Sequence, residues 1–446
     1  MNTNFRILST LAAILLFVGL LSAGYAQADS ANITSVSLDP TFSDDGWTTL
    51  DFFGRSDIVD SVLIQPDGRL ILSGQVAVNT TSRDFGLARY NPDGTLDDTF
   101  GTGGMLNLDL GGREYTGVAV LQSDGKIVVG GEQSISGTDF IIARLNTDGS
   151  LDTTFGAPNG YVVTDLGGSD SIYGLALLPD GRIVAAGSSY STDSDLAIAR
   201  YNPNGSLDTT FAAPNGYQVI DLPNEQNGNS ITLQADGAIV LAGSTNANGL
   251  MDFLLARINP DGGLDPTFGT GGLVTTDFSS GVDVALDVAQ QPDGKLVAVG
   301  SATVDSASHI ALARYNADGS LDETFGINGL VTTVAGNYPG AHAVAIQGGL
   351  ITVAGECFVS DVDFVVARYD STGSLDPNFG SGGLIISDLG TAYDGARDIL
   401  IQPNGDVVVA GFTQPGTYYD FAIARYTTTS TTISRIFLPT LVKGTP

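Results

Sequence analysis

The stretch ALARYNADGSLDETFG, residues Ala311 to Gly326, determines the fold of this chain, because close copies of it recur down the whole sequence. Two half-copies complete the set, SLDPTF at Ser37 near the start and AIARY at Ala422 near the end. The leucine of the SLD element recurs at intervals of 54 to 58 residues, at Leu38, Leu96, Leu151, Leu207, Leu264, Leu321 and Leu375. A fixed period of this length indicates a solenoid, a propeller or an array.

The strand content of one unit decides among these architectures. Residues 263–319 contain four short extended runs, 273–277, 284–291, 295–300 and 309–315, and none has helical periodicity. The turn between the second and third runs reads PDG, SDG, ADG or PNG in most units, and these residues accept the positive φ of a tight hairpin. Leucine-rich and β-helix solenoids have shorter periods and fewer strands per repeat. The sequence therefore predicts an all-β, seven-bladed β-propeller of four-stranded blades, one blade per repeat of 54 to 58 residues.

An arginine and an aspartate occur in every unit at constant spacing. The arginine follows alanine each time, at Arg89, Arg144, Arg200, Arg257, Arg314, Arg368 and Arg425. Eight residues after each of the first six stands an aspartate, at Asp97, Asp152, Asp208, Asp265, Asp322 and Asp376. An arginine on a packed strand needs a partner, because an unpaired buried charge is very costly. We therefore predict a bidentate Arg–Asp pair in each unit.

The first and last units each hold half of such a pair. Asp39 has no arginine before it, and Arg425 has no aspartate after it. We predict that these two residues pair across the junction of the termini and close the ring. A phenylalanine follows each aspartate by three residues and is predicted to plug the space between blades, at Phe42, Phe100, Phe155, Phe211, Phe268, Phe325 and Phe379.

At these residues the chain resembles the delta-60 repeat family of secreted bacterial proteins. The resemblance rests on the hairpin Q-P-D-G-K-[LI]-V-x-x-G followed by F-x-[LIV]-A-R-Y-N-x-D-G-S-L-D-x-T-F-G, and it covers Ser37 to Tyr426. It implies a β-propeller-like fold and no catalytic residues. The unit with Gly348-Gly349 has a shortened hairpin, and His309 replaces the aspartate that precedes most of the fourth runs.

The termini carry different sequences. Residues 1–28 read as a secretory signal that ends in the cleavage site Ala26-Gln27-Ala28, so a secreted or cell-surface protein is expected. Residues 29–36 are an N-terminal lead, and residues 37–426 form the seven-repeat propeller. Residues 427–446 are predicted to be a Thr/Ser-rich linker and a short apolar tail. No other segment of the mature chain is long and apolar enough to span a bilayer.

The composition limits the partners. The formal net charge is −31 and only three lysines occur, so the basic stripe of a nucleic-acid binder is missing. We expect an acidic, soluble monomer whose ligand is a protein or a glycan.

Few residues of this sequence belong to catalytic or metal-binding patterns. His309 and His342 have no metal-ligand spacing, and the single cysteine, Cys357, reads as a buried thiol. We therefore assign no catalytic or cofactor-binding residue. The N-x-D-G-S-L-D loops offer oxygens to a calcium ion, but the same residues suit a tight turn, so calcium stays an alternative. SLDxTF is similar to the sialidase Asp-box but two residues shorter.

Two functional classes remain. The first, which we favour, is a non-catalytic binding or scaffold module. The second is an extracellular carbohydrate-active hydrolase or lyase with a carboxylate site at the central channel. Either site is expected among the irregular residues that lead into the second runs, since these vary while the rest repeats: Tyr115, Tyr173, Glu225, Asp283, Tyr338, Tyr393 and Arg397.

Overall fold

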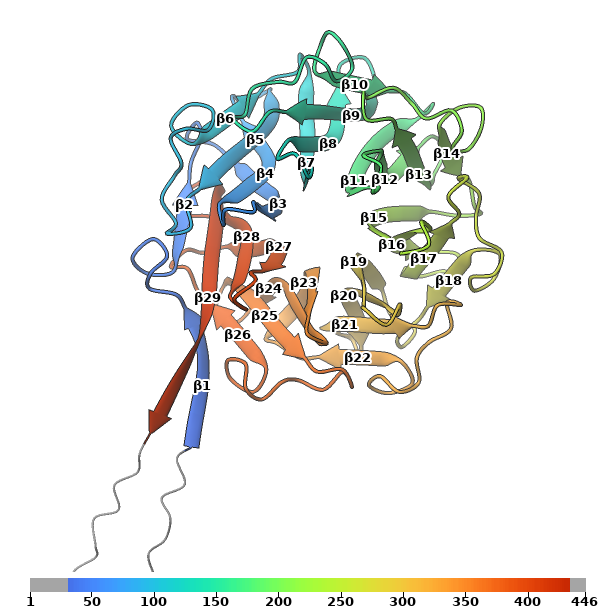
Figure 1. Ribbon diagram of the computed structural model, residues 1–446. Coiled ribbons are helices and arrows are strands. Elements are labelled where there is room, and N and C mark those ends of the chain that lie inside the picture. Colours follow the sequence, from blue (N-terminus) through green and yellow to red (C-terminus); the bar gives the residue numbers. More distant parts are fainter. Residues whose placement is uncertain (1–30, 434–446) are drawn as a thin grey trace, which may run out of the picture. The chain divides into compact units, whose positions relative to one another are not determined.

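The computed structural model describes residues 31–433, whose strands form seven antiparallel sheets set as blades around one axis (Figure 1). The predicted all-β, seven-bladed propeller is confirmed. The compact unit Val36–Thr428 contains the ring. Within residues 31–433 there is no helix long and apolar enough to cross a membrane. The signal sequence expected at residues 1–28 and the tail from residue 434 lie outside the described residues.

Six blades consist of four strands in chain order, and the last sheet combines β27, β28 and β29 with β1 and β2. The innermost strands surround the axis in Figure 1 and are β3 (Asp57–Ile64), β7 (Arg113–Leu121), β11 (Ser169–Leu177), β15 (Gln226–Leu233), β19 (Asp283–Gln290), β23 (Asn337–Gln347) and β27 (Asp394–Ile401). The second strands are β4 (Leu70–Ala77), β8 (Ile127–Ser134), β12 (Ile183–Tyr190), β16 (Ile239–Thr245), β20 (Leu296–Val304), β24 (Leu350–Phe358) and β28 (Val407–Thr413).

The outer half of each blade contains the repeated motif. The third strands are β5 (Arg83–Tyr90), β9 (Thr138–Leu145), β13 (Ser194–Tyr201), β17 (Asp252–Ile258), β21 (Ala307–Tyr315), β25 (Val362–Tyr369) and β29 (Asp420–Ile433). The outermost strands are β6 (Met105–Leu108), β10 (Tyr161–Thr164), β14 (Tyr217–Ile220), β18 (Leu273–Thr276), β22 (Leu330–Thr333), β26 (Leu384–Ser387) and β2 (Trp47–Leu50).

The blades are offset by one strand from the sequence repeats. The run at 273–277, read as the first of its unit, is the outermost strand of the preceding blade, and it pairs with β17 through Ala256 and Leu273. The chain turns back after each third strand, so the next extended run pairs with that strand's free edge. The last blade therefore lacks an outermost strand of its own, and the N-terminal β2 supplies it, with Trp47 opposite Ala424. This pairing closes the ring.

The segments that flank the repeats extend the last sheet. Strand β1 (Ala31–Leu38) overlaps the expected N-terminal lead and neighbours β29. Strand β29 continues to Ile433, so it includes the first residues of the expected Thr/Ser-rich linker.

The core lies between the blades. Each hydrophobic cluster combines residues of two neighbouring sheets, as where Ile71 and Phe85 of one blade pack with Ile127 and Ile141 of the next. In β17 the adjacent residues Phe253 and Leu254 point to opposite faces and are both buried. Both faces of a blade are thus removed from water, which is the main favourable term in stability.

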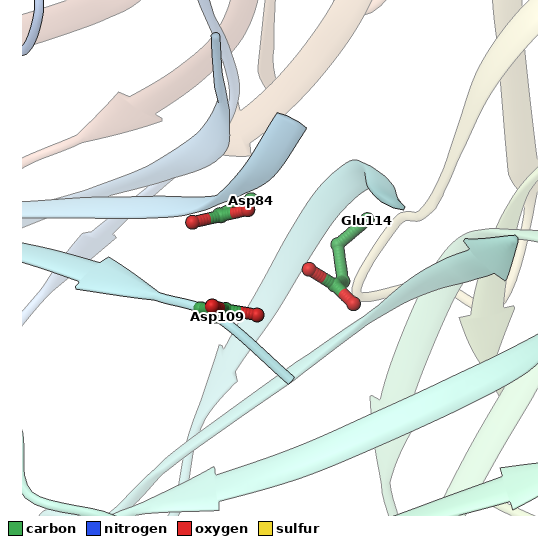
Figure 2. A group of neighbouring side chains, drawn as sticks. All are labelled: Asp84, Asp109 and Glu114. Atoms are coloured by element: carbon green, nitrogen blue, oxygen red, sulfur yellow. The ribbon is translucent and has the colours of Figure 1, made fainter. Parts of the chain in front are cut away.

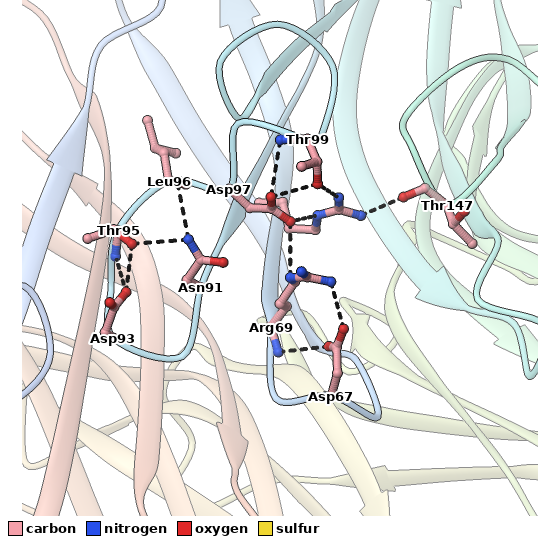
Figure 3. A network of polar contacts seen from close by, with 10 residues as sticks. Asp67, Arg69, Asn91, Asp93, Thr95, Leu96, Asp97, Thr99 and Thr147 are labelled. Carbon is pink, nitrogen blue, oxygen red and sulfur yellow. Dashed lines mark hydrogen bonds and ion pairs between the residues drawn. The ribbon is translucent and has the colours of Figure 1, made fainter.

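The arginine of each repeat lies where one blade meets the next. Arg89 Nε donates to Asp97 Oδ2 at 2.7 Å, and its Nη2 donates to Thr99 Oγ1 at 3.0 Å. Its Nη1 donates to the carbonyl of Thr147 in the following blade, and its guanidinium lies 4.8 Å above the Phe100 ring. We call this arrangement of arginine, aspartate, threonine and phenylalanine the clasp. Figure 3 shows its polar part, with Asp97, Thr99 and Thr147.

The clasp is not the bidentate pair that the spacing predicted. In the clasp of Arg314 both Nε and Nη2 contact the same oxygen, Oδ2 of Asp322, at 2.7 Å. The other oxygen accepts hydrogen bonds from the backbone and hydroxyl of Thr324. The threonine two residues on therefore occupies the oxygen that a second arginine bond would need.

The terminal clasp has the same contacts as the clasp of Arg89. Arg425 Nε donates to Asp39 Oδ2 at 2.8 Å, and Arg425 Nη1 donates to the carbonyl of Pro92 in the first blade at 2.6 Å. Arg425 and Asp39 are 7% and 6% exposed. The predicted closing pair is confirmed, and the plug role is supported because every phenylalanine of the clasps is fully buried.

The terminal clasp should contribute as much to stability as an internal one. We expect Arg425→Ala to lower the free energy of unfolding by about 3 kcal/mol or more, because it leaves the Asp39 carboxylate buried and unpaired. Arg314→Ala is the matched control, and denaturant titration measures both. A cost for Arg425→Ala well below that for Arg314→Ala would contradict closure through this pair.

Candidate functional site

The antiparallel strands place different features on the two faces of the ring. The hairpins and clasps lie where the innermost and third strands end. The opposite face, which we call the loop face, carries the turns from second to third strands and the connections from each outermost strand to the next innermost one. The non-repeating residues named from the sequence lie in these connections or the innermost strands that follow them.

Every innermost strand contains a β-bulge at the same position. The register with the second strand shifts there, as between Val59 and Ser61 and between Ala396 and Asp398. The residues at this position all differ and are Asp60, Gly117, Tyr173, Asn229, Leu286, His342 and Arg397. Bulges re-aim side chains and are enriched beside active sites, so this ring of seven unlike residues is one candidate site.

Three of the polar groups at this ring form a cluster. Arg397 Nη1 lies 2.7 Å from His342 Nε2 and 3.4 Å from Glu356 Oε2, and the guanidinium lies 4.9 Å from the Phe412 ring. Burial, reinforced by the charge of Arg397, lowers the pKa of His342 although Glu356 opposes it. The imidazole is therefore neutral and accepts a hydrogen bond from Arg397. The side chains of these three charged or titratable residues stay 22–26% exposed.

A second polar group joins the second and third blades, with Glu132 on β8 and Ser171 on β11. The hydroxyl of Ser171 donates to Glu132 Oε2, and burial followed by the charge of Glu132 raises the pKa of Tyr173. Burial also raises the pKa of Glu132.

Three aspartates of the innermost strands bind the next blade. Asp60 Oδ2 accepts the N–H of Gly117, Asp287 Oδ2 accepts that of Val344, and Asp398 Oδ2 accepts that of Val62, at 2.7–2.8 Å. Burial raises the pKa of Asp60 and Asp287 to about 6 and that of Asp398 to about 7. Burial is the main cause of these raised pKa values, the backbone hydrogen bonds oppose it, and the charges of Asp287 and Asp60 add to the rise at Asp398. The same carboxyl groups link adjacent blades, and we assign no catalytic role to them.

A pocket of about 280 Å³ opens on the loop face where the last, first and second blades meet. Its lining includes the arginines Arg55, Arg83 and Arg113 and the tyrosines Tyr115 and Tyr418. The Arg55 guanidinium lies 5.9 Å from the Tyr418 ring, and that of Arg83 lies 5.9 Å from the Tyr115 ring. Within residues 31–433, none of the three arginines forms an ion pair. We call this the arginine pocket.

The same face carries groups of three carboxylates at the blade junctions. Three groups take one residue from the start of a third strand, one from the end of the adjacent outermost strand and one from the start of the next innermost strand, as with Asp84, Asp109 and Glu114 (Figure 2). Two more groups have these positions, Asp139/Asp165/Asp170 and Asp252/Asp277/Asp283, and a fourth is Asp361/Asp363/Asp388. In each, the offered oxygens lie within 4.8 Å of one another.

The structure distributes the seven sequence-predicted residues over several surroundings. Arg397 joins the bulge cluster, Tyr173 the group with Ser171, Tyr115 the arginine pocket and Asp283 a carboxylate group.

Tyr393 stacks on Phe412, whereas Glu225 is bound to Asn246 and Tyr338 is 80% exposed. The seven residues named from the sequence therefore do not form one site.

The other sequence-derived candidates have structural roles or surroundings. The N-x-D-G-S-L-D loop closes on itself, with Asp148 Oδ1 accepting the backbone and hydroxyl of Ser150. Cys357 is buried, which raises its pKa to about 11. His309 lies at the one junction where none of the three carboxylate positions is acidic, with Val334 and Pro339 at the other two.

Sequence reasoning missed the arginine pocket and the carboxylate groups. The sequence did contain a signal for the carboxylate groups. An aspartate at the end of the outermost strand is followed five or six residues later by an acidic residue, as in Asp109 with Glu114 and Asp277 with Asp283.

The comparison with family models agrees with this architecture. The model described as "Domain of unknown function (DUF5122) beta-propeller" matches residues 65–100, 122–155, 178–211, 234–268, 291–325 and 349–379. The chain is a β-propeller repeat protein. The matched segments run from the hairpin through the clasp of six blades and leave out the bulge residues of the innermost strands.

Solved structures share this propeller repeat protein's fold at low identity. A streptogramin B lyase is 12% identical with a TM-score of 0.50, covering 86% of this chain and 97% of its own. Virginiamycin B lyase from Staphylococcus aureus is 13% identical with a TM-score of 0.49, covering 85% and 98%. The polysaccharide lyase Uly1 is 11% identical with a TM-score of 0.44, covering 90% and 97%. These likenesses concern the fold alone. No curated protein matches the chain in sequence.

The raised pKa of Asp398 should make the propeller less stable as pH rises. The folded chain keeps a proton on this group up to about pH 7, whereas the unfolded chain loses it near pH 4. Stability therefore falls between these values, since the folded state binds more protons there.

Asp398→Asn should remove this dependence. We expect the destabilisation by this substitution, measured by denaturant unfolding, to be smaller at pH 8 than at pH 5 by about 1 kcal/mol or more. An equal cost at both pH values would show that Asp398 has an ordinary pKa. Ser61→Ala, at the same position of another blade and without a titratable group, should show no such difference.

Proposed function

We propose that this protein is a binding module for an acidic glycan, and that the arginine pocket holds a charged group of that ligand. An extracellular location, expected from residues 1–28, is part of the proposal. The observation that supports it is the gathering of Arg55, Arg83 and Arg113 around one pocket, without an ion pair in the described residues, on a chain of net charge −31. Most other arginines of residues 31–433 neutralise aspartates of clasps.

The chemistry of the pocket fits a carboxylate or sulfate on a ring-shaped group. A guanidinium presents a planar fork of donors that matches such an anion, and charge-assisted hydrogen bonds are about twice as strong as neutral ones. The rings of Tyr115 and Tyr418 add apolar faces with polar tips, and Tyr418 is 43% exposed.

The size of the pocket favours a glycan over a protein ligand. A volume of about 280 Å³ suits one small group held in a concavity. A protein partner of ordinary affinity covers about 800 Å² on each side, far more than this pocket offers.

Neutralising the pocket arginines should weaken binding. We expect Arg113→Ala and Arg83→Ala each to raise the Kd for a uronic acid oligosaccharide about tenfold or more, because each removes a charge-assisted contact. Isothermal titration calorimetry at low and high salt measures the effect, and binding of the wild type should weaken with salt. Arg182→Gln is the matched control, since it removes one positive charge near the hairpins and clasps.

Three outcomes would count against this proposal. Unchanged affinity of both pocket variants would place the ligand elsewhere. Equal affinity for a neutral oligosaccharide would remove the role of the arginines. Specific binding of a protein, with no binding on an array of acidic glycans, would assign the ligand to the other class.

A second candidate is a carbohydrate-active hydrolase or lyase at the bulge cluster. It is favoured by the neutral His342 beside Glu356 and Arg397, three partly exposed groups of which His342 and Arg397 occupy bulge positions that differ in every blade. Turnover of a polysaccharide that is lost in His342→Ala and kept in Arg113→Ala would establish this candidate. Absence of turnover on chromogenic glycosides and uronic acid polymers would leave the binding module.

A further inference from the structure

Within residues 31–433, the buried carboxylate groups on the loop face form no ion pair with a basic side chain. Asp84 is 3% exposed and Glu114 is fully buried, and their carboxyl groups face that of Asp109 in Figure 2. No ion pair within residues 31–433 includes any of the three. Three carboxylates this close repel one another, and burial destabilises their charged forms. The arrangement therefore needs either protons or a cation.

The hydrogen bonds leave one buried oxygen of this group without a partner. Glu114 Oε1 accepts hydrogen bonds from the N–H of Gly112 and from Gln133 Nε2, whereas Oε2 has none. Asp84 Oδ2 accepts one from Asn107 Nδ2 at 2.7 Å. A fully buried carboxylate oxygen without a donor is costly, and here it belongs to a carboxyl group that faces two other carboxyl groups.

The same feature occurs at two other carboxylate groups. Asp170 Oδ1 and Asp363 Oδ1 are buried oxygens without a hydrogen-bond partner, and their residues are 0% and 3% exposed. In the group of Asp252, Asp277 and Asp283, by contrast, both oxygens of Asp283 accept backbone hydrogen bonds.

We propose that three junctions on the loop face each bind a calcium ion, through Asp84/Asp109/Glu114, Asp139/Asp165/Asp170 and Asp361/Asp363/Asp388. The ligands are all oxygens, as a hard cation requires, and no His or Cys is present to favour zinc. Calcium holds oxygens at about 2.3–2.6 Å, so two ligands on opposite sides are about 4.6–5.2 Å apart. The offered oxygens of each group lie within 4.8 Å of one another, close enough for one cation to contact all three. Calcium accepts irregular sets of oxygens, whereas magnesium demands near-ideal octahedral geometry and keeps several waters.

These sites are independent of the arginine pocket and of the glycan proposal. The first two groups join the third strand of a blade, its outermost strand and the first residues of the next blade, whereas Asp361/Asp363/Asp388 joins the third and outermost strands of one blade. A bound ion at either of the first two would therefore stabilise the junction between blades on the face opposite the clasps.

Thermal unfolding of the full mature chain tests the proposal. After dialysis against a chelator, 5 mM CaCl₂ should raise the Tm by about 2 °C or more, and 5 mM MgCl₂ should raise it less. Calorimetric titration with CaCl₂ should show about three sites per chain. Absence of both a Tm shift and heat of binding would overturn the proposal and leave protonated carboxyl groups as the explanation.

The exposed member of each group allows a variant that keeps the fold. Asp109, Asp165 and Asp388 are exposed, so the triple variant Asp109→Asn/Asp165→Asn/Asp388→Asn leaves the buried carboxylates in place. We expect it to lose the calcium-dependent shift, and Asp109→Asn alone to lose about one third of the bound calcium. Asp98→Asn, at an exposed aspartate near a clasp, is the matched control. A calcium response as large in the triple variant as in the wild type would show that the ions bind elsewhere.

Discussion

The buried Arg–Asp contact of the clasp is the interaction on which the rest of the structure depends. Six of the arginines reach from a third strand to the segment that turns the chain back and to a carbonyl of the next blade, as Arg89 does with Asp97 and Thr147. A buried charge pair adds little net stability over an apolar substitute, but breaking it is expensive. The clasp therefore fixes which segments meet, and the apolar faces between blades supply most of the free energy.

The protonation of the clasp follows from the same contacts. Although burial raises the pKa of Asp152, the hydrogen bonds from Lys126, Thr154 and Arg144 outweigh it and hold that pKa well below its usual range. The stabilisation is complete above about pH 4, where the unfolded chain ionises, and is lost only as pH falls through the lower folded value. The clasps thus remain charged under conditions in which Asp398 still exchanges a proton.

The two faces of the ring differ in how closely they follow the sequence repeat. The clasps repeat because each one has the same structural role. The loop face departs from the repeat at the bulge residues and at the arginine pocket, and a ligand needs one specific set of groups rather than seven equal ones. The carboxylate groups repeat only in part, since Gln226 and Val334 replace acidic residues at two junctions. A cation at the group with Glu114 would also reduce the negative charge next to Arg113.

The fold and the clasp could be predicted from the sequence because both depend on a constant spacing. Asp39 and Arg425 lie 386 positions apart, yet the register of the repeats was enough to pair them. The offset of the blades was missed because the linear repeat does not show which neighbour an outermost strand joins. The arginine pocket was missed because Arg55, Arg83 and Arg113 come from separate segments that only the closed ring brings together. The predicted bidentate geometry was wrong because the threonine two residues after the aspartate donates to the oxygen that a second arginine bond would need.

The ring closes where Asp39 meets Arg425, through the backbone contact that all seven clasps share. In every clasp the aspartate N–H donates to the carbonyl of its arginine, at 2.8 Å for Asp39 with Arg425 and at 2.8–2.9 Å in the rest. Hydrogen exchange of these amides in the full mature chain tests the claim most directly. The structure predicts that the amide of Asp39 exchanges as slowly as those of Asp97 and Asp322. Exchange of Asp39 at the rate of an open chain end, with the other aspartates protected, would contradict it.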